Sequence, residues 1–251
     1  MKNEITSRPA HNSEAAPTKP STPAEAFALA AAEAGQLQER LDIYSAYSRE
    51  LRPEVNQAYD ELIARLNGLK KIGPSLGTPI PGFYLPDQDG HLVSLESLLS
   101  DGPLILSLNR GHWCPWCRLE LRALAQVHDE ARKLGAQAVS IIPETLAYSR
   151  HLIADNGLPF RVLTDLDLAY ALSLGLMIWA GDRIRALYLK SGLNLPLFQR
   201  NEGWFLPIPA TFLIGRDGVV QARFVDPDFR KRMEPRDILN ALRKLSRSQG
   251  Y

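Results

Sequence analysis

The chain has 251 residues, of which 45% are hydrophobic and 23% are charged, enough for one large domain with an appendage. Its 29 Lys and Arg residues nearly balance 28 Asp and Glu residues, so the formal charge of +1 provides no overall field to attract nucleic acid or an anionic membrane. No stretch has the roughly 20 apolar residues needed to cross a bilayer, and the amino terminus lacks the apolar segment of a secretory signal. We therefore expect a cytoplasmic protein without a nucleic-acid or membrane partner.

The first 70 residues divide into a polar tail and a helical leader. Residues 1–22 are rich in Pro, Ser, Thr and Asn, and they are predicted to be a disordered tail because they bury too little surface to offset the entropy of folding. Residues 23–70 carry apolar side chains at helical spacing on both sides of Pro53, which predicts two amphipathic helices. These faces are expected to pack on the body of the protein or on a second copy, as in a homodimer through the leader; a dedicated partner-binding arm is the alternative.

After a Gly- and Pro-rich linker the pattern changes from helical to extended. The predicted elements are a hairpin with an Asp-Gly turn (83–93), a short helix (95–99), a buried strand (103–109), a long helix (114–134), a strand (138–142), a helix (145–154), a strand (160–163), a helix (168–174), a hairpin (211–225) and a last helix (235–245). This order predicts an α/β domain over residues 74–247, with a mixed central sheet flanked by helices. Residues 176–205 are less regular and are predicted to be an insertion.

The two cysteines, Cys114 and Cys117, are three positions apart, where the buried strand gives way to the long helix. Such strand ends are where α/β sheets place ligands. If Pro115 is the first helical residue, Cys114 is the N-cap, and we expect its exposed sulfur to face the unpaired N–H groups of the first turn. Helical spacing places Cys117 on the same side, so that a small adjustment closes a disulfide.

Charged neighbours are expected to ionise Cys114. The helix dipole, together with Arg110, His112 and Arg118, is predicted to lower the pKa of the Cys114 thiol below the ordinary value of about 8.5. The thiolate is the nucleophilic form of cysteine. Cys114 is thus predicted to attack a sulfur or a peroxide oxygen, and Cys117 to attack the product, leaving a Cys114–Cys117 disulfide without any cofactor.

Other roles for a CxxC pair fit this sequence less well. A zinc site needs four ligands, and only His112 lies beside the pair. Haem attachment requires a histidine after the second cysteine, where Arg118 stands. A structural bridge would close too small a loop to stabilise much, whereas two buried, inert thiols stay open as an alternative. We therefore expect redox chemistry and no metal.

Further residues are candidates for contact with substrate. Trp113 and Trp116 flank the pair, where they either shield the sulfurs and bind an apolar substrate or fill the core. His128 and His151 lie on or near apolar helix faces, which favours a structural role. Pro209 directly precedes an apolar strand, as expected of a proline at a sheet edge or of a cis bond.

Three segments carry a resemblance to a known family: GFYLPDQDGHLVSL (82–95), RGHWCPWC (110–117) and PIPATFLIGRDG (207–218). Together they resemble the peroxiredoxin-like branch of the alkyl hydroperoxide reductase and thiol-specific antioxidant family, within the thioredoxin-like superfamily. The resemblance covers about residues 74–245 and implies a thioredoxin-like fold. It also implies that Pro209 is the cis proline which thioredoxin-like proteins place against the active-site sulfur.

The resemblance assigns the attacking sulfur in two ways. A standard peroxiredoxin carries PxxxTxxC with the peroxidatic cysteine last, together with a distant arginine that polarises the peroxide. In that register Cys117 attacks, Arg110 and Cys114 replace the proline and the threonine, and the arginine position falls on Pro209, so the usual activating set is absent. In thioredoxin and glutaredoxin the first cysteine attacks, in agreement with the expected place of Cys114 at the start of the helix, and we favour Cys114.

The sequence thus predicts a thiol oxidoreductase that reduces hydrogen peroxide or organic hydroperoxides. The resemblance implies this substrate class, and implies regeneration by a thioredoxin-like protein or a small thiol. Two alternatives stay open: thiol–disulfide exchange without peroxide, and a non-enzymatic redox sensor in which the CxxC sets the affinity of the leader for a partner.

Overall fold

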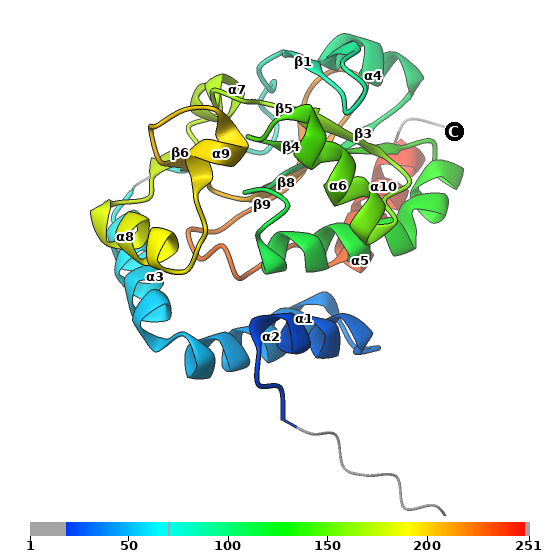
Figure 1. Cartoon of the computed structure of the whole chain (residues 1–251). Coiled ribbons are helices and arrows are strands. Elements are labelled where there is room, and N and C mark those ends of the chain that lie inside the picture. Colours follow the sequence, from blue (N-terminus) through cyan, green and yellow to red (C-terminus); the bar gives the residue numbers. More distant parts are fainter. Residues whose placement is uncertain (1–18, 70, 249–251) are drawn as a thin grey trace, which may run out of the picture.

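A computed structural model describes residues 19–69 and 71–248 of the chain (Figure 1). Most of the predicted tail, residues 1–18, lies outside the described residues. The leader that follows contains three helices instead of the two predicted: α1 (Pro23–Ala32), α2 (Leu37–Leu51) and α3 (Pro53–Leu66). Helix α1 escaped prediction because its buried face is mostly alanine, which gives little hydrophobic periodicity.

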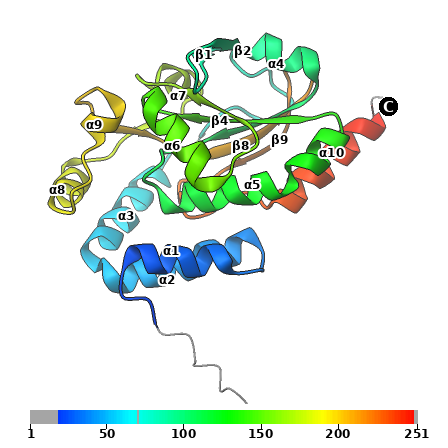
Figure 2. The same cartoon turned by 45° about the vertical axis from the view of Figure 1, so that its right-hand side comes forward.

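The leader packs on the body of the same chain. Figures 1 and 2 show α1 and α2 side by side beneath the long helix α5 (Pro115–Lys133), with α3 rising beside the sheet. The apolar stripes predicted for α2 and α3 are buried in this packing, among them Leu41, Tyr44 and Tyr59. The leader therefore shares a hydrophobic core with the α/β domain.

The central sheet is mixed and has five strands in the order β5-β4-β3-β8-β9. The strands are β3 (Leu104–Leu108), β4 (Gln137–Ile142), β5 (Arg161–Thr164), β8 (Ala210–Ile214) and β9 (Val220–Val225). Strand β3 pairs with β4 in parallel and with β8 in antiparallel orientation, so it is central and all five of its residues are buried. The continuous apolar run that predicted this strand is typical of one covered on both faces.

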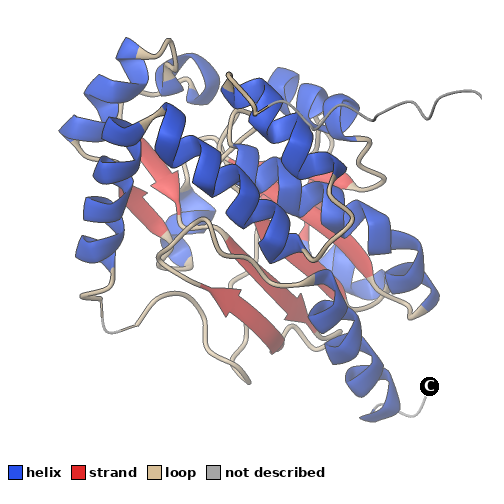
Figure 3. Ribbon diagram, turned by 90° about the horizontal axis from the view of Figure 1, so that it is seen from below, coloured by secondary structure: helices blue, strands red, loops and turns tan. Residues whose placement is uncertain are grey.

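Each face of the sheet has its own hydrophobic core. Ile105 and Leu213 point to the core formed with α5, α6 (Leu146–Asn156) and α10 (Pro235–Ser248). Alternate residues such as Leu106 and Phe212 point to the other face, and their core continues to the leader. Helices and strands in layers are visible from below in Figure 3.

The remaining elements of the domain lie at its edges. They are the hairpin β1 (Tyr84–Pro86) and β2 (Leu92–Ser94), then α4 (Leu95–Asp101) and α7 (Ala169–Ser173). Ser94 caps α4 as the sequence predicts, because its hydroxyl accepts the N–H of Ser97. Among the described residues, no helix combines the length and the apolar character that a membrane crossing requires.

The insertion at 176–205 is more regular than its sequence suggested. Strands β6 (Met177–Trp179) and β7 (Phe205–Pro207) form an antiparallel pair. Helices α8 (Asp182–Lys190) and α9 (Leu195–Gln199) lie between these strands in the sequence. Helix α8 packs on α3, and the hydroxyl of its Tyr188 lies 2.9 Å from the hydroxyl of Tyr59. The insertion and the leader therefore meet over one end of the domain, the end at which α5 begins.

Candidate active site

The two cysteines lie where β3 leads into α5. Cys114 is the N-cap of α5 with an extended backbone, and Pro115 is the first helical residue, as predicted. The Cys114 sulfur makes no regular capping hydrogen bond, although the backbone N–H of Cys117 helps to stabilise its thiolate. Instead it accepts the thiol hydrogen of Cys117, with the two sulfurs 2.9 Å apart. A disulfide bond is about 2.0 Å long, so the free thiols are close to the geometry of a bridge.

Both sulfurs are buried, and this corrects the prediction of an exposed Cys114. The relative exposure of each cysteine is 0%. The cause is that the leader and the insertion cover the start of α5, a position that the sequence did not predict for either segment. Trp116, beside the pair, packs edge-on against Tyr44 and Tyr59 of the leader and donates its indole N–H to the Ser45 hydroxyl at 2.9 Å.

The surroundings nevertheless favour an ionised Cys114. Burial raises the pKa of this thiol, but the hydrogen bond from Cys117 and the positive charges of Arg110 and Arg232 outweigh burial and lower the pKa from 9.0 to about 7. The surroundings shift the pKa of the Cys117 thiol in the opposite direction. Burial, the hydrogen bond to Cys114 and the negative charge of Cys114 raise the pKa of the Cys117 thiol well above its ordinary value. Near neutral pH the thiol of Cys114 therefore ionises more readily than that of Cys117.

Arg110 is a buried cation that faces aromatic rings and a sulfur. Its guanidinium lies 4.0 Å from the ring centroid of Phe229, and its Nη2 donates to the Tyr188 hydroxyl at 2.9 Å. Its Nη1 has no hydrogen-bond partner, and no carboxylate of the described residues lies within ion-pair distance of it. The negative charge on Cys114 therefore offsets the charge of Arg110.

Arg232 provides a second cation, and the sequence analysis missed it. This residue follows β9, and its Nη2 lies 3.5 Å from the sulfur of Cys117. Its Nε donates to Glu120 at 2.7 Å, and the other carboxylate oxygen of Glu120 accepts the hydroxyl of Thr211, also at 2.7 Å. Glu120 was the available signal, since it is an acidic residue one turn beyond Cys117 on the buried face of α5 and requires a partner there.

The other charged residues predicted around the pair have partners of their own. His112 lies 2.9 Å from Glu144 through Nδ1 and stacks on the ring of Tyr148. Arg118 is half-buried with its guanidinium 4.2 Å from the ring centroid of Phe27, and it interacts electrostatically with Cys114. The structure thus brings Arg110 and Arg118 to the thiol, whereas His112 is engaged by a carboxylate.

Trp113 and Pro209 complete the predicted set. Trp113 is half-buried, with its ring centroid 5.5 Å from that of Tyr188 and 5.2 Å from the Arg110 guanidinium. The peptide bond before Pro209 is trans, which corrects the cis bond that the resemblance implied. Pro209 directly precedes β8, whose first residue pairs with Leu108. It therefore lies at the sheet end from which the cysteine loop departs.

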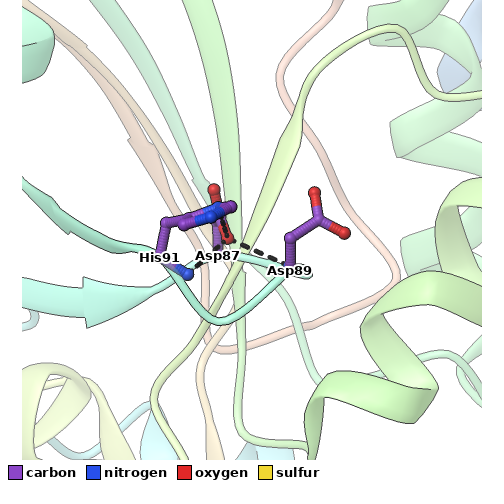
Figure 4. Close-up of side chains that lie close together, drawn as sticks. All are labelled: Asp87, Asp89 and His91. Carbon is purple, nitrogen blue, oxygen red and sulfur yellow. Dashed lines mark hydrogen bonds and ion pairs between the residues drawn. The ribbon is translucent and has the colours of Figure 1, made fainter.

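One group in the described residues has the composition of a metal site, and it is separate from the cysteines. Asp87, Asp89 and His91 lie together in the β1–β2 turn (Figure 4). The buried Asp87 carboxylate accepts the backbone N–H groups of Asp89 and His91, each at 3.0 Å. Such bonds fasten a hairpin turn, so Asp87 has a structural role without a metal.

Comparison with known proteins places this site in a family. Residues 76–223 match the AhpC/TSA family. A curated relative, peroxiredoxin Q (chloroplastic) of Oryza sativa subsp. japonica, is 26% identical over 147 residues, which cover 59% of this chain and 57% of the relative. The thiol:disulfide interchange protein DsbE of Pseudomonas aeruginosa is 28% identical over 151 residues, which cover 60% of this chain and 66% of the relative. The chain thus spans less than two thirds of these relatives.

Solved structures show the same fold. Peroxidoxin BcpB from Mycobacterium tuberculosis superposes with a TM-score of 0.54 at 21% identity, covering 70% of this chain and 99% of that one. Peroxiredoxin Q of Xanthomonas campestris gives a TM-score of 0.51 at 16% identity, covering 65% and 91%. These neighbours, together with the mixed sheet and its helices, confirm the predicted thioredoxin-like fold. On the match over residues 76–223, the chain belongs to the AhpC/TSA family.

Proposed function

We propose that the protein is a thiol-dependent peroxidase that reduces hydrogen peroxide or organic hydroperoxides. The observation that carries the proposal is the sulfur pair: two free thiols 2.9 Å apart, with the pKa of Cys114 lowered to about 7. A thiol ionised near neutral pH is a nucleophile, and a second thiol in contact resolves its oxidised product.

The reaction proceeds in three balanced steps. The Cys114 thiolate attacks a peroxide oxygen, the O–O bond breaks, and Cys114 becomes a sulfenic acid while the alkoxide or hydroxide takes up a proton. The Cys117 sulfur then attacks the sulfenic sulfur, and the hydroxyl group leaves as water with the thiol proton. A thioredoxin-like protein or a small thiol finally supplies two electrons and two protons to reopen the disulfide.

Buried arginines assist the first step electrostatically. Arg110 and Arg232 stabilise the Cys114 thiolate in a site with little water to screen their charge. Because neither sulfur has exposed surface, a substrate atom reaches Cys114 only when the adjoining loop or the leader moves. The rate of that movement sets an upper limit on the rate of oxidation.

A second function, thiol–disulfide exchange, is favoured by one observation. In this chain the first cysteine of the CxxC has the lowered pKa, which is the arrangement suited to attack on a disulfide. The similarity to a protein named as a thiol:disulfide interchange protein points in the same direction. This function uses the same sulfur pair but gives its two electrons to a disulfide instead of to a peroxide.

Stopped-flow tryptophan fluorescence separates the two functions, because Trp113 and Trp116 flank the sulfurs. The reduced protein is mixed with hydrogen peroxide, with cumene hydroperoxide, or with bis(2-hydroxyethyl) disulfide. The proposal predicts a fast signal with a hydroperoxide, absent in Cys114→Ser. A fluorescence change with the disulfide but with neither hydroperoxide would show that the function is disulfide exchange and not peroxide reduction.

The predicted cytoplasmic location and homodimer also belong to the proposal. The apolar faces of α2 and α3 already lie against the body, so a homodimer would use the outer surface of the leader. Sedimentation velocity of the reduced and oxidised protein measures this association directly.

A further inference from the structure

A cavity of about 450 Å³ lies beside the start of α5, in the cover formed by the leader and the insertion. Its walls come from α1, α2, α3, the first turn of α5 and the turn that follows α8. This volume is within the range of sites that bind small organic molecules. Trp113 and Pro115 both line it, and they are the two chain neighbours of Cys114.

Five of the fourteen residues that line the cavity are aromatic. Phe27, Tyr44, Tyr59, Trp113 and Trp116 contribute rings from four different elements. The Trp116 ring centroid is 5.0 Å from that of Tyr44 and 6.1 Å from that of Tyr59, both edge-on, so the rings support one another in fixed positions. A wall of this kind fits the apolar body of a ligand.

The charges on the cavity wall have one sign. Of the charged residues in the described part of the chain, Arg52 and Arg118 line the cavity, and no Asp or Glu does. Arg52 donates to the Ser191 hydroxyl at 3.1 Å and Arg118 to the Asn156 side chain at 3.4 Å. Neither guanidinium has a carboxylate within ion-pair distance in residues 19–69 and 71–248. Both therefore have donors left for an anion, and a carboxylate matches the fork of a guanidinium.

Both arginines and the reactive sulfur act electrostatically on one ring of the cavity wall, that of Tyr44. Burial raises the pKa of Tyr44 to about 12, and the charges of Arg52, Cys114 and Arg118 also act on this phenol. The cations and the thiolate thus lie around one ring. A molecule whose anionic end binds the arginines would have its apolar body against Trp113 and Trp116, next to Cys114.

Building on the proposed function, we propose that this cavity binds an organic carboxylate with an apolar body. The carboxylate belongs either to the hydroperoxide that oxidises Cys114 or to the small thiol that reduces the disulfide. Arg52 lies in the leader, outside the family match at residues 76–223, whereas Arg118 lies inside it, so the leader supplies one of the two cations of the site.

The first experiment compares two hydroperoxides that differ by one charge. Single-turnover oxidation is measured with cumene hydroperoxide and with its para-carboxylate, in the wild type, in Arg52→Gln/Arg118→Gln and in Arg49→Gln. Arg49→Gln is the control because it removes a positive charge from α2, three residues before Arg52, at a position that does not line the cavity. If the carboxylate belongs to the hydroperoxide, the wild type should be oxidised about tenfold faster by the para-carboxylate than by cumene hydroperoxide. This preference should be lost in the double variant and retained in Arg49→Gln.

The second experiment makes the same comparison for the reducing step. The oxidised protein is mixed with 3-mercaptopropionate or with neutral 2-mercaptoethanol, and the reopening of the disulfide is followed by fluorescence. If the carboxylate belongs to the reducing thiol, the double variant should be reduced by 3-mercaptopropionate about tenfold more slowly than the wild type, relative to the rates with 2-mercaptoethanol. Each rate is compared within one variant, so a general loss of folding does not mimic the effect.

A binding experiment separates this inference from the proposed function. Tryptophan fluorescence of Cys114→Ser, which has no nucleophilic sulfur, is titrated with 2-naphthoate and with neutral 2-naphthalenemethanol. The inference predicts that the naphthoate binds more tightly than the neutral probe, and that this preference is lost in the triple variant, which also carries Arg52→Gln and Arg118→Gln. That result supports the anion site even if the protein turns over no hydroperoxide. Equal binding of the two probes, together with rate ratios near one in both half-reactions, overturns it.

Discussion

Cys114 and Cys117 are one helical turn apart, yet their surroundings act on them in opposite directions. The pKa of Cys114 is lowered to about 7 and that of Cys117 is raised, although burial raises both. The difference arises because Cys114 accepts the hydrogen bond that Cys117 donates, and because Arg110 and Arg232 favour a negative charge on Cys114. Hydrogen bonding and the charges of neighbouring side chains therefore make the two thiols of this CxxC motif unequal in acidity.

The largest expected effect comes from exchanging each sulfur in turn. Cys114→Ser should abolish turnover, because it removes the ionised nucleophile. Cys117→Ser should oxidise once and then stop, either as a mixed disulfide or as a sulfenic acid, because nothing resolves the product. Steady-state turnover and intact mass measure both outcomes. The reverse pattern would assign the attack to Cys117, as in the peroxiredoxin register.

Next in size is the effect of the buried ion pair behind Cys117. Glu120→Gln should lower the free energy of unfolding by about 3–5 kcal/mol, because Arg232 then keeps a buried charge without a carboxylate. Urea denaturation of the reduced protein measures the loss. In Glu120→Gln/Arg232→Met the charge is also removed, so part of the stability should return. Two losses that simply add would show that the pair is not coupled.

The pH dependence of stability provides a smaller and more specific test. Between pH 7 and 9 the Cys114 thiol is ionised in the folded chain but binds a proton in the unfolded chain, so stability rises with pH. Relative to Cys114→Ser, the free energy of unfolding of the reduced wild type should rise by about 2–3 kcal/mol over this window and should lose the gain as the pH falls to 7. Cys117, with its raised pKa, stays protonated in the folded chain, so it lowers stability at the upper end of this window, where the unfolded thiol begins to ionise. If the difference in the free energy of unfolding between the wild type and Cys114→Ser did not change with pH, Cys114 would be protonated in the folded chain.

Removing the charge of Arg110 should reduce the difference in pKa between the two thiols. Arg110→Met replaces a buried charge by an apolar chain of similar length and should raise the pKa of Cys114, slowing its alkylation by iodoacetamide at pH 7 by about tenfold. The thiolate absorbance at 240 nm gives the pKa directly. Arg236→Gln removes an exposed charge far along the chain and should leave the titration unchanged. An unchanged pKa in Arg110→Met would mean that the hydrogen bond from Cys117 and the charge of Arg232 are sufficient without Arg110.

Sequence patterns predicted the parts of the fold that depend on neighbouring residues. Apolar periodicity located the central strand, the long helix and the helices α2 and α3, and Pro115 located the start of α5. Helix α1 and the paired strands of the insertion were missed because short or alanine-rich elements have little pattern of their own. Their stability comes from packing against residues distant in sequence.

The sequence by itself determined that two thiols share one helix face at the end of a buried strand, because three-residue spacing and a proline after the first cysteine leave few other arrangements. Tertiary structure decided what surrounds them. Arg232, 115 positions after Cys117, reaches its sulfur, and the leader covers Cys114. Burial and charge depend on distances in space, and only the folded chain brings these groups together.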